Sequence, residues 1–206
     1  MKNYAEMMFS EAVSDLQKKD GSYDKYQAGY RHRTQDGFEP QDVAFIQSRE
    51  SFYIASTSPD GWPYVQHRGG PQGFLNVTGP SQIACLDYKG NRQFITMGHL
   101  KTDDRVSLFL MDYMQRARLK LQGHATLKSL EEADPALVKQ LDPTGKPAER
   151  LLVIDVVAMD WNCPKYIPQM FTKPVVETLL ARGLDDLQKE NEQLRARLAE
   201  LGVGEA

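Results

Sequence analysis

The sequence predicts a mainly β protein with helices at both ends, built around an antiparallel barrel or sandwich. Two observations carry this prediction: six or seven short segments are rich in β-branched and aromatic residues, and few helical segments separate them. A parallel α/β sheet would need a helix between most pairs of strands. The candidate strands are residues 51–58, 62–68, 74–77, 83–88, 105–113, 117–127 and 150–159.

The N-terminal region is expected to be helical. Its first sixteen residues combine an apolar stripe with a charged face, and the pattern ends at Asp20-Gly21, a stop and turn signal. A polar connection is expected over residues 22–37. Pro40 suits the first turn of a second, short helix, because proline lacks the N–H that this turn leaves unpaired.

Two further helices are expected between the strands. Residues 91–100 would begin with Asn91 as the N-cap. Residues 134–141 would begin with Asp134 as the N-cap and Pro135 at the next position. Both are short, so the centre of the chain stays dominated by strands.

The C-terminal tail has leucines at heptad spacing, which is typical of a coiled coil. Asn191 falls at a core a position, a device that specifies a two-stranded parallel register, and Glu190 and Arg195 could pair across such a dimer. The alternative is that this helix packs its leucines on its own barrel. The remaining core positions are Leu184 and Leu198 at a, with Leu180, Leu187, Leu194 and Leu201 at d.

These patterns divide the chain into three regions. Residues 1–48 form an N-terminal helical region, residues 49–171 form the β domain, and residues 172–206 form the C-terminal heptad helix.

Composition excludes several classes of protein. Lys and Arg number 25 against 28 Asp and Glu, a formal net charge of −3, which disfavours a nucleic-acid binder. No apolar run approaches the roughly 18 residues of a membrane span, and acids within the N-terminal apolar stretch argue against a secretory signal. Two distant cysteines, Cys85 and Cys163, suit a reducing compartment. We therefore expect a soluble cytoplasmic protein.

Several catalytic and binding motifs are absent from the sequence. No G-x-G-x-x-G follows a strand, Gly145-Lys146 lacks the rest of a phosphate-binding loop, and no G-x-S-x-G is present. The four histidines are scattered, without metal-ligand spacing, so no metal site is expected. Nucleophilic and metal-assisted hydrolysis are both disfavoured.

Residues 62–74 are the first of three segments that could hold a ligand. Tyr64, Gln66 and Arg68 share one face of the strand. Val65 and His67 share the other face, so both faces mix polar groups with apolar ones. The alternative is an ordinary edge strand that ends in a glycine turn.

Residues 86–94 are the second such segment, at the turn from a strand into the expected helix. Arg92 and Gln93 would lie in the first helical turn, behind Asn91. Because a helix N-terminus is already electropositive, an arginine there indicates a bound anion such as a phosphate. A solvated arginine is the alternative.

Residues 115–123 are the third segment. Arg116, Arg118 and Lys120 would fall on one face of a strand, where like charges repel unless water or an anion neutralises them. A solvated edge is the alternative here. Together the three segments favour an anion site built on a strand-rich domain.

The ordered set of these segments resembles the pyridoxamine 5′-phosphate oxidase-like family of FMN-binding split barrels. The resemblance runs from about Phe38 to Phe171. It implies a six-stranded antiparallel split barrel and a homodimer that holds two FMN molecules at the subunit interface. The segments that carry it are SFYIASTSPDGWPYVQHRGGPQGF, DYKGNRQFITMGHL, RVSLFLMDYMQRARLKLQGHA and WNCPKYIPQMF.

The resemblance also implies roles for individual residues. The first strand pair would offer side chains to the flavin ring and phosphate, the next strand would follow the ribityl chain, and the turn after it would hold the phosphate. The partner subunit would add an arginine near the ring and a Trp-Asn pair that closes over it. In that order the residues are Gln66, His67 and Arg68; Asp87 and Tyr88; Asn91, Arg92 and Gln93; and Arg118, Trp161 and Asn162.

One departure from the family pattern affects the expected activity. True pyridoxamine phosphate oxidases hold their substrate with an arginine and a histidine near the C-terminus, whereas no histidine follows His124 here. The chain therefore resembles an uncharacterised flavin-binding branch of the family, and not the true oxidase.

The leading hypothesis is an FMN-dependent oxidoreductase that acts on a small molecule or a reduced nicotinamide. No catalytic residue can be named, although His67 is a candidate base because it lies beside the flavin strand. The first alternative is a non-catalytic flavin-binding or sensor protein. The second is a split barrel that binds another cofactor, such as haem or a deazaflavin. Neither a nucleic acid nor a membrane is expected as a partner.

Overall fold

The computed structural model describes residues 1–31, 35–142, 145, 147–161 and 164–201. It separates into two compact units. The first comprises Met1–Asp112 and Arg116–Tyr166, and the second comprises Tyr113–Gln115 and Ile167–Ala206. No helix in the described part of the chain is long and apolar enough to cross a membrane. The division at residues 48 and 171 stays a prediction.

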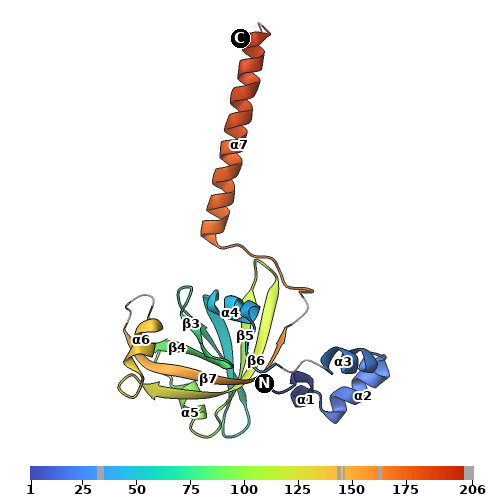
Figure 1. Ribbon diagram of the computed structural model, residues 1–206, viewed down its shortest axis with the longest axis vertical. Coiled ribbons are helices and arrows are strands. Elements are labelled where there is room, and N and C mark those ends of the chain that lie inside the picture. The colour runs from blue at the N-terminus through green and yellow to red at the C-terminus, as the bar shows by residue number, and fades with distance from the viewer. Residues whose placement is uncertain (32–34, 143–144, 146, 162–163, 202–206) are drawn as a thin grey trace. The chain divides into compact units, whose positions relative to one another are not determined.

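The first unit is organised around one antiparallel sheet of seven strands, in the order β2-β1-β5-β6-β7-β4-β3 (Figure 1). The predicted mainly β, antiparallel class is confirmed. The number of strands implied by the family resemblance, six, is wrong, because all seven candidate segments form strands. Their bounds are β1 Ser51–Thr57, β2 Pro63–Gly69, β3 Leu75–Gly79, β4 Gln82–Tyr88, β5 Arg105–Asp112, β6 Ala117–Ser129 and β7 Ala148–Trp161.

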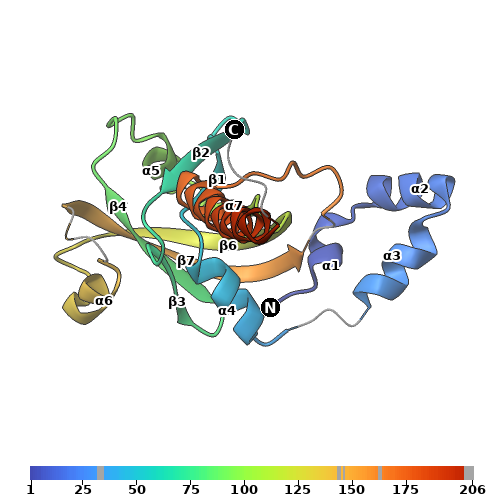
Figure 2. The ribbon, with the colours of Figure 1, turned by 90° about the horizontal axis from the view of Figure 1, so that it is seen from above.

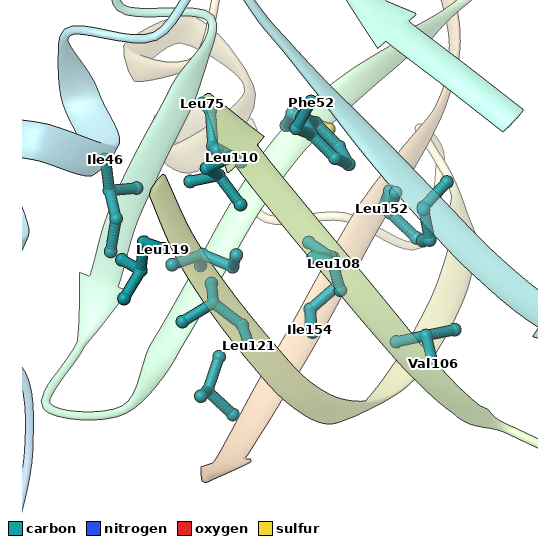
Figure 3. Close-up of a cluster of buried hydrophobic side chains, with 14 of the residues drawn as sticks. Ile46, Phe52, Leu75, Val106, Leu108, Leu110, Leu119, Leu121, Leu152 and Ile154 are labelled. Atoms are coloured by element: carbon teal, nitrogen blue, oxygen red, sulfur yellow. The ribbon is translucent and has the colours of Figure 1, made fainter. Parts of the chain in front are cut away.

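Alternation along the strands sends one set of side chains into the core. In β5, Val106, Leu108 and Leu110 are buried while the residues between them are more exposed. Leu119 and Leu121 of β6 and Phe52 of β1 join them from the neighbouring strands (Figure 3). Burying each such side chain contributes roughly 1.5–3 kcal/mol. This core holds the strands that carry the candidate site.

Ahead of the helix that Pro40 was expected to begin, the described N-terminal residues form α1 Tyr4–Met8, α2 Glu11–Asp20 and α3 Tyr23–Tyr30. The predicted stop is confirmed, because Gly21 ends α2 in the left-handed conformation with φ 82°. The polar connection predicted over residues 22–37 is wrong, since α3 lies within it. Figure 1 and Figure 2 show α2 and α3 side by side. The ring of Phe9 makes T-shaped contacts with the rings of Tyr26 and Tyr30, and these tertiary contacts favour the extra helix.

The remaining helices of the first unit are α4 Pro40–Gln47, α5 Ile95–His99 and α6 Pro135–Gln140. Pro40 opens α4, and the Asp134 carboxylate accepts a hydrogen bond from the backbone N–H of Ala136 at the start of α6, so both predicted helix starts are confirmed. The helix predicted over residues 91–100 is much shorter, because α5 begins only at Ile95.

The buried Arg49 connects α4 to the sheet. Its guanidinium donates hydrogen bonds to the carbonyls of Phe45 and Met111 and forms an ion pair of 2.6 Å with Asp112. Phe45 is one of the last residues of α4, so the arginine pairs a carbonyl that the helix end leaves open. Arg49 thus links the end of α4 to β5, although nothing in the local sequence distinguishes this arginine.

The second unit contains α7, Lys173–Glu200, a helix of 28 residues. None of its residues is buried. Within this unit, the backbone N–H of Met170 and the side chain of Gln169 donate to the carbonyls of Tyr113 and Met114. The pairing of this helix with another copy stays a prediction.

Candidate functional site

The first unit contains a pocket of about 320 Å³, between β2, β4, the start of β7 and the segment that leads into α5. Such a volume lies at the lower end of the range for small-molecule sites. Eight of the eleven residues singled out by the sequence line it. They are Gln66, His67, Arg68, Asp87, Tyr88, Asn91, Arg92 and Gln93.

Strand β2 points Gln66 and Arg68 toward the pocket, because residues two apart share a face of a strand. The hydroxyl of Thr96 donates to Oε1 of Gln66 at 2.8 Å, which fixes the amide from α5. His67 borders the pocket, but its ring lies on the other face of β2 and makes a T-shaped contact with the ring of Tyr53. Polar side chains therefore occur on both faces of β2 for different reasons. One face lines the pocket, and the other is exposed to solvent.

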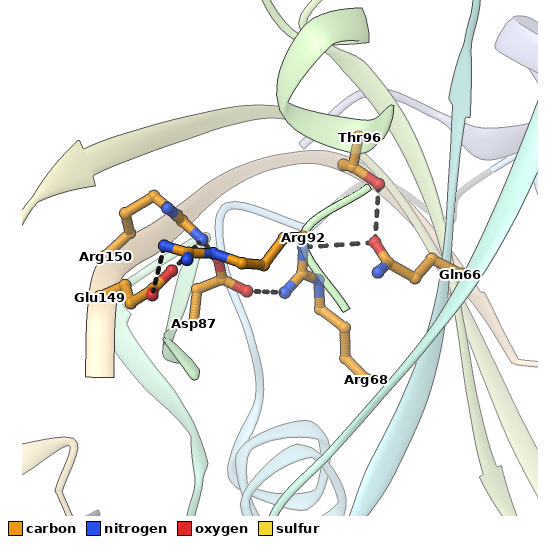
Figure 4. Close-up of polar contacts among 7 residues, drawn as sticks. All are labelled: Gln66, Arg68, Asp87, Arg92, Thr96, Glu149 and Arg150. Carbon is orange, nitrogen blue, oxygen red and sulfur yellow. Dashed lines mark hydrogen bonds and ion pairs between the residues drawn. The ribbon is translucent and has the colours of Figure 1, made fainter. Parts of the chain in front are cut away.

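Asp87 is the centre of the charged network beside the pocket (Figure 4). Its side chain is only 8% exposed. One carboxylate oxygen pairs with Arg68, and the other accepts from Nε of Arg150 at 2.9 Å. Two cations compensate one buried carboxylate, which reduces the large penalty for removing that charge from water. Asp87 thus holds two arginines at fixed positions.

Arg150 and Glu149 are pocket residues that sequence reasoning missed. Residues 150–159 were interpreted only as a strand, although pairing of β4 with β7 sets Arg150 directly opposite Asp87. Arg150 also donates to Glu149 at 2.9 Å, and Arg92 approaches Glu149 at 3.9 Å. Only the pairing of two strands more than sixty residues apart reveals this contact, so no local signal could have found it.

The segment before α5 is not the helix start that the sequence predicted. Arg92 and Phe94 have φ values of 63° and 56°, which interrupt helical geometry. The side chain of Asn91 accepts from the backbone N–H of Gln93 at 3.2 Å, as in a local turn, and does not cap a helix. The prediction that Arg92 lies in the first turn of a helix is therefore wrong. The cationic character of the pocket comes from side chains instead.

The pocket side chains carry one more cation than anion, since Arg68, Arg92 and Arg150 face Asp87 and Glu149. Arg92 is 63% exposed in its side chain and can move toward a ligand. Arginine pairs with phosphate through two parallel hydrogen bonds, so this end of the pocket suits a phosphate.

One buried polar atom beside the pocket supports a ligand at this site. Nε of Arg68 has no hydrogen-bond partner among the described residues. The hydroxyl of Tyr88 is also unpaired there, but this side chain packs with Ala84 and Leu86 on the other face of β4 from Asp87. Leaving such a group unpaired costs about 1–3 kcal/mol, and it is uncommon in folded proteins. A phosphate oxygen of a ligand could accept a hydrogen bond from Nε of Arg68.

The other three predicted residues do not line this pocket in the described chain. Arg118 lies on the opposite face of β6 from the buried leucines, with its guanidinium 5.9 Å from the centre of the Phe109 ring. Trp161 packs against Phe45 of the same chain and donates to Asp42 at 2.9 Å. Asn162 lies outside the described residues.

Comparisons with known proteins identify a family model that matches most of the chain and a solved structure with a similar fold. Residues 38–162 match a family model described as pyridoxamine 5′-phosphate oxidase. A search of curated proteins finds no match. The structure of HupZ from Group A Streptococcus aligns with a TM-score of 0.50 and 10% identity, over 65% of this chain and 100% of HupZ. At such low identity, this likeness supports the fold alone.

Two further solved structures are less similar to the chain. An F420 reductase aligns with a TM-score of 0.43 and 18% identity, over 62% of this chain and 98% of the reductase. An FAD-binding protein from Mesorhizobium loti aligns with a TM-score of 0.41 and 13% identity, over 60% of this chain and 94% of that protein.

Proposed function

Because the chain belongs to the pyridoxamine 5′-phosphate oxidase family, we propose that its pocket binds FMN and that the protein is an FMN-dependent oxidoreductase. The observation that carries this proposal is the group of three arginines, Arg68, Arg92 and Arg150, at one pocket. A phosphate there would replace Glu149 as the partner of Arg92 and gain charge-assisted hydrogen bonds.

The pocket residues fit such a group, since the unpaired Nε of Arg68 suits a phosphate oxygen. Bound FMN would supply the redox chemistry. The chain would bind and orient it, with Gln66 held by Thr96 as a fixed polar contact. Asp87 acts indirectly, because it positions two of the arginines.

The proposal includes a homodimer in which each subunit completes the other's flavin site. Arg118 of the partner subunit would approach the ring, and its Trp161 and Asn162 would close over it. In the single chain, Nε of Arg118 is buried and has no hydrogen-bond partner among the described residues, which leaves it available to a ligand.

A second candidate is a flavin-binding protein without turnover. The position of His67 favours it, because the only candidate base named from the sequence contacts Tyr53 on the face of β2 opposite Gln66. Bleaching of bound flavin by NADH or NADPH, followed in the visible spectrum, separates the two candidates. A spectrum typical of haem or a deazaflavin would instead replace FMN in the proposal.

Replacing Arg92 with alanine should weaken FMN binding about ten- to a hundredfold, because a charge-assisted contact worth roughly 1.5–3 kcal/mol is lost. Riboflavin lacks the phosphate, so its affinity should be the same in Arg92→Ala and in the original protein. Fluorescence titration of both ligands measures this difference.

The matched control is Arg105→Ala, which removes an arginine that is 76% exposed in its side chain and is paired with Asp103 away from the pocket. It should leave both affinities unchanged. Equal FMN affinity in Arg92→Ala and Arg105→Ala would reject the phosphate site. An equal loss of riboflavin and FMN affinity would indicate a distorted pocket instead of a lost phosphate contact.

Pyridoxamine 5′-phosphate should be a poor substrate, because no histidine follows His124 to help hold it. Oxygen consumption by the FMN-loaded protein should stay near the rate measured without substrate. Rapid oxygen uptake on addition of the compound would show that other residues of this chain hold the substrate.

A further inference from the structure

The helix α7 presents a row of exposed leucines with no cover from its own unit. The large side chains Leu180, Leu184, Leu187, Leu194, Leu198 and Leu201 are all 48–70% exposed. Rows of this kind are rarely left in water on a stable helix. Together with Asn191, these leucines are spaced alternately by four and three residues, so they form one stripe along the helix.

We propose that this stripe binds a second copy of the same helix, as a parallel two-stranded coiled coil from Leu180 to Leu201. The core positions are self-complementary: in a parallel pair each a residue faces its own copy, and so does each d residue. Asn191, the polar a residue, then faces another Asn191, and the two amides can hydrogen-bond.

An antiparallel pair would place Asn191 beside a leucine at a d position, which leaves its amide without a partner in an apolar seam. The same consideration disfavours packing of the stripe on an unrelated apolar surface. A polar residue in the middle of the helix interface favours a partner helix that has the same residue at the same position along its length.

The charges beside the seam favour the same arrangement. Glu190 lies at g and Arg195 at the following e, so the two helices of a parallel pair would have opposite charges facing each other on both sides. Asp185 and Lys189 form a pair of 2.6 Å within one helix, at the outward b and f positions. This intrahelical pair therefore does not compete for the positions that flank the seam.

The test uses cysteine substitutions in the full chain, one at a time, under mild oxidation. Leu180→Cys and Leu198→Cys should each form a disulfide-linked dimer, because in-register parallel helices place each residue beside its own copy. Glu192→Cys, at an outward b position, is the matched control and should stay at the background level of the unsubstituted chain.

Cross-linking at both ends of the stripe distinguishes parallel helices from antiparallel ones. Leu180 and Leu198 are eighteen residues apart, or about 27 Å along the helix, so an antiparallel pair could bring at most one of them beside its own copy. Dimer formation by both variants and not by Glu192→Cys supports the proposal. Monomeric Leu180→Cys and Leu198→Cys would overturn it, as would cross-linking that is equal at all three positions.

Discussion

Replacing Asp87 with asparagine should lower the free energy of unfolding by roughly 3–5 kcal/mol, because it removes the anion that compensates two largely buried arginines. Arg68 and Arg150 have side chains only 13% and 20% exposed. Without Asp87, neither cation can regain full hydration. In a protein of this size the midpoint of thermal unfolding would fall by roughly 6–20 °C.

Chemical denaturation of the variant measures this loss, with Asp185→Asn as the matched control. Asp185 also pairs with one cation, Lys189, but both side chains are at least 60% exposed. Its loss should therefore cost only about 0.3–0.5 kcal/mol. A destabilisation by Asp87→Asn no larger than that of Asp185→Asn would show that the buried network is not holding the arginines.

Cys85 should react with a disulfide reagent at pH 8 about a thousandfold more slowly in the native protein than after unfolding. Burial raises the pKa of its thiol from 9.0 to about 12, although Arg68 lowers the pKa and Asp87 raises it further. Each unit of pKa reduces the reactive thiolate tenfold, and only the thiolate attacks a disulfide. Burial behind the pocket slows access as well.

The assay uses Cys163→Ser, so that Cys85 is the single thiol, and compares native buffer with guanidinium chloride. The same pKa shift predicts lower stability in alkali. Between about pH 9 and 12 the unfolded chain loses the thiol proton while the native chain keeps it, so stability falls by up to about 1.4 kcal/mol per pH unit. Fast labelling of the native protein would show that β4 opens readily.

The strands were predictable because their pattern is local. Alternation in residues 105–113 and a continuous apolar run in residues 83–86 are visible without knowing any neighbour, and both lie in strands of the sheet. The helices were less predictable from the sequence. Residues 23–30 form α3 around aromatic contacts with Phe9, and a contact of this kind leaves no trace in the local sequence.

The start of α5 shows how a local signal can mislead. Asn91 followed by Arg92 has the appearance of a capped helix start, yet positive φ at Arg92 and Phe94 delays the helix to Ile95. Phe94 instead lies beneath Arg150, 5.7 Å from ring centre to guanidinium. A tertiary contact of this kind can offset the small cost of an unusual backbone conformation.

The sequence by itself determined the antiparallel β class, the family and eight of the residues that line the pocket, because alternation, turns and ordered motifs are properties of short segments. Only the tertiary structure decided that β4 lies beside β7, and therefore that Arg150 and Glu149 join Asp87 and Arg92. The physical reason is that strand order depends on the packing of the whole core. Many strand orders can bury the same alternating residues, and the complete set of contacts selects one of them.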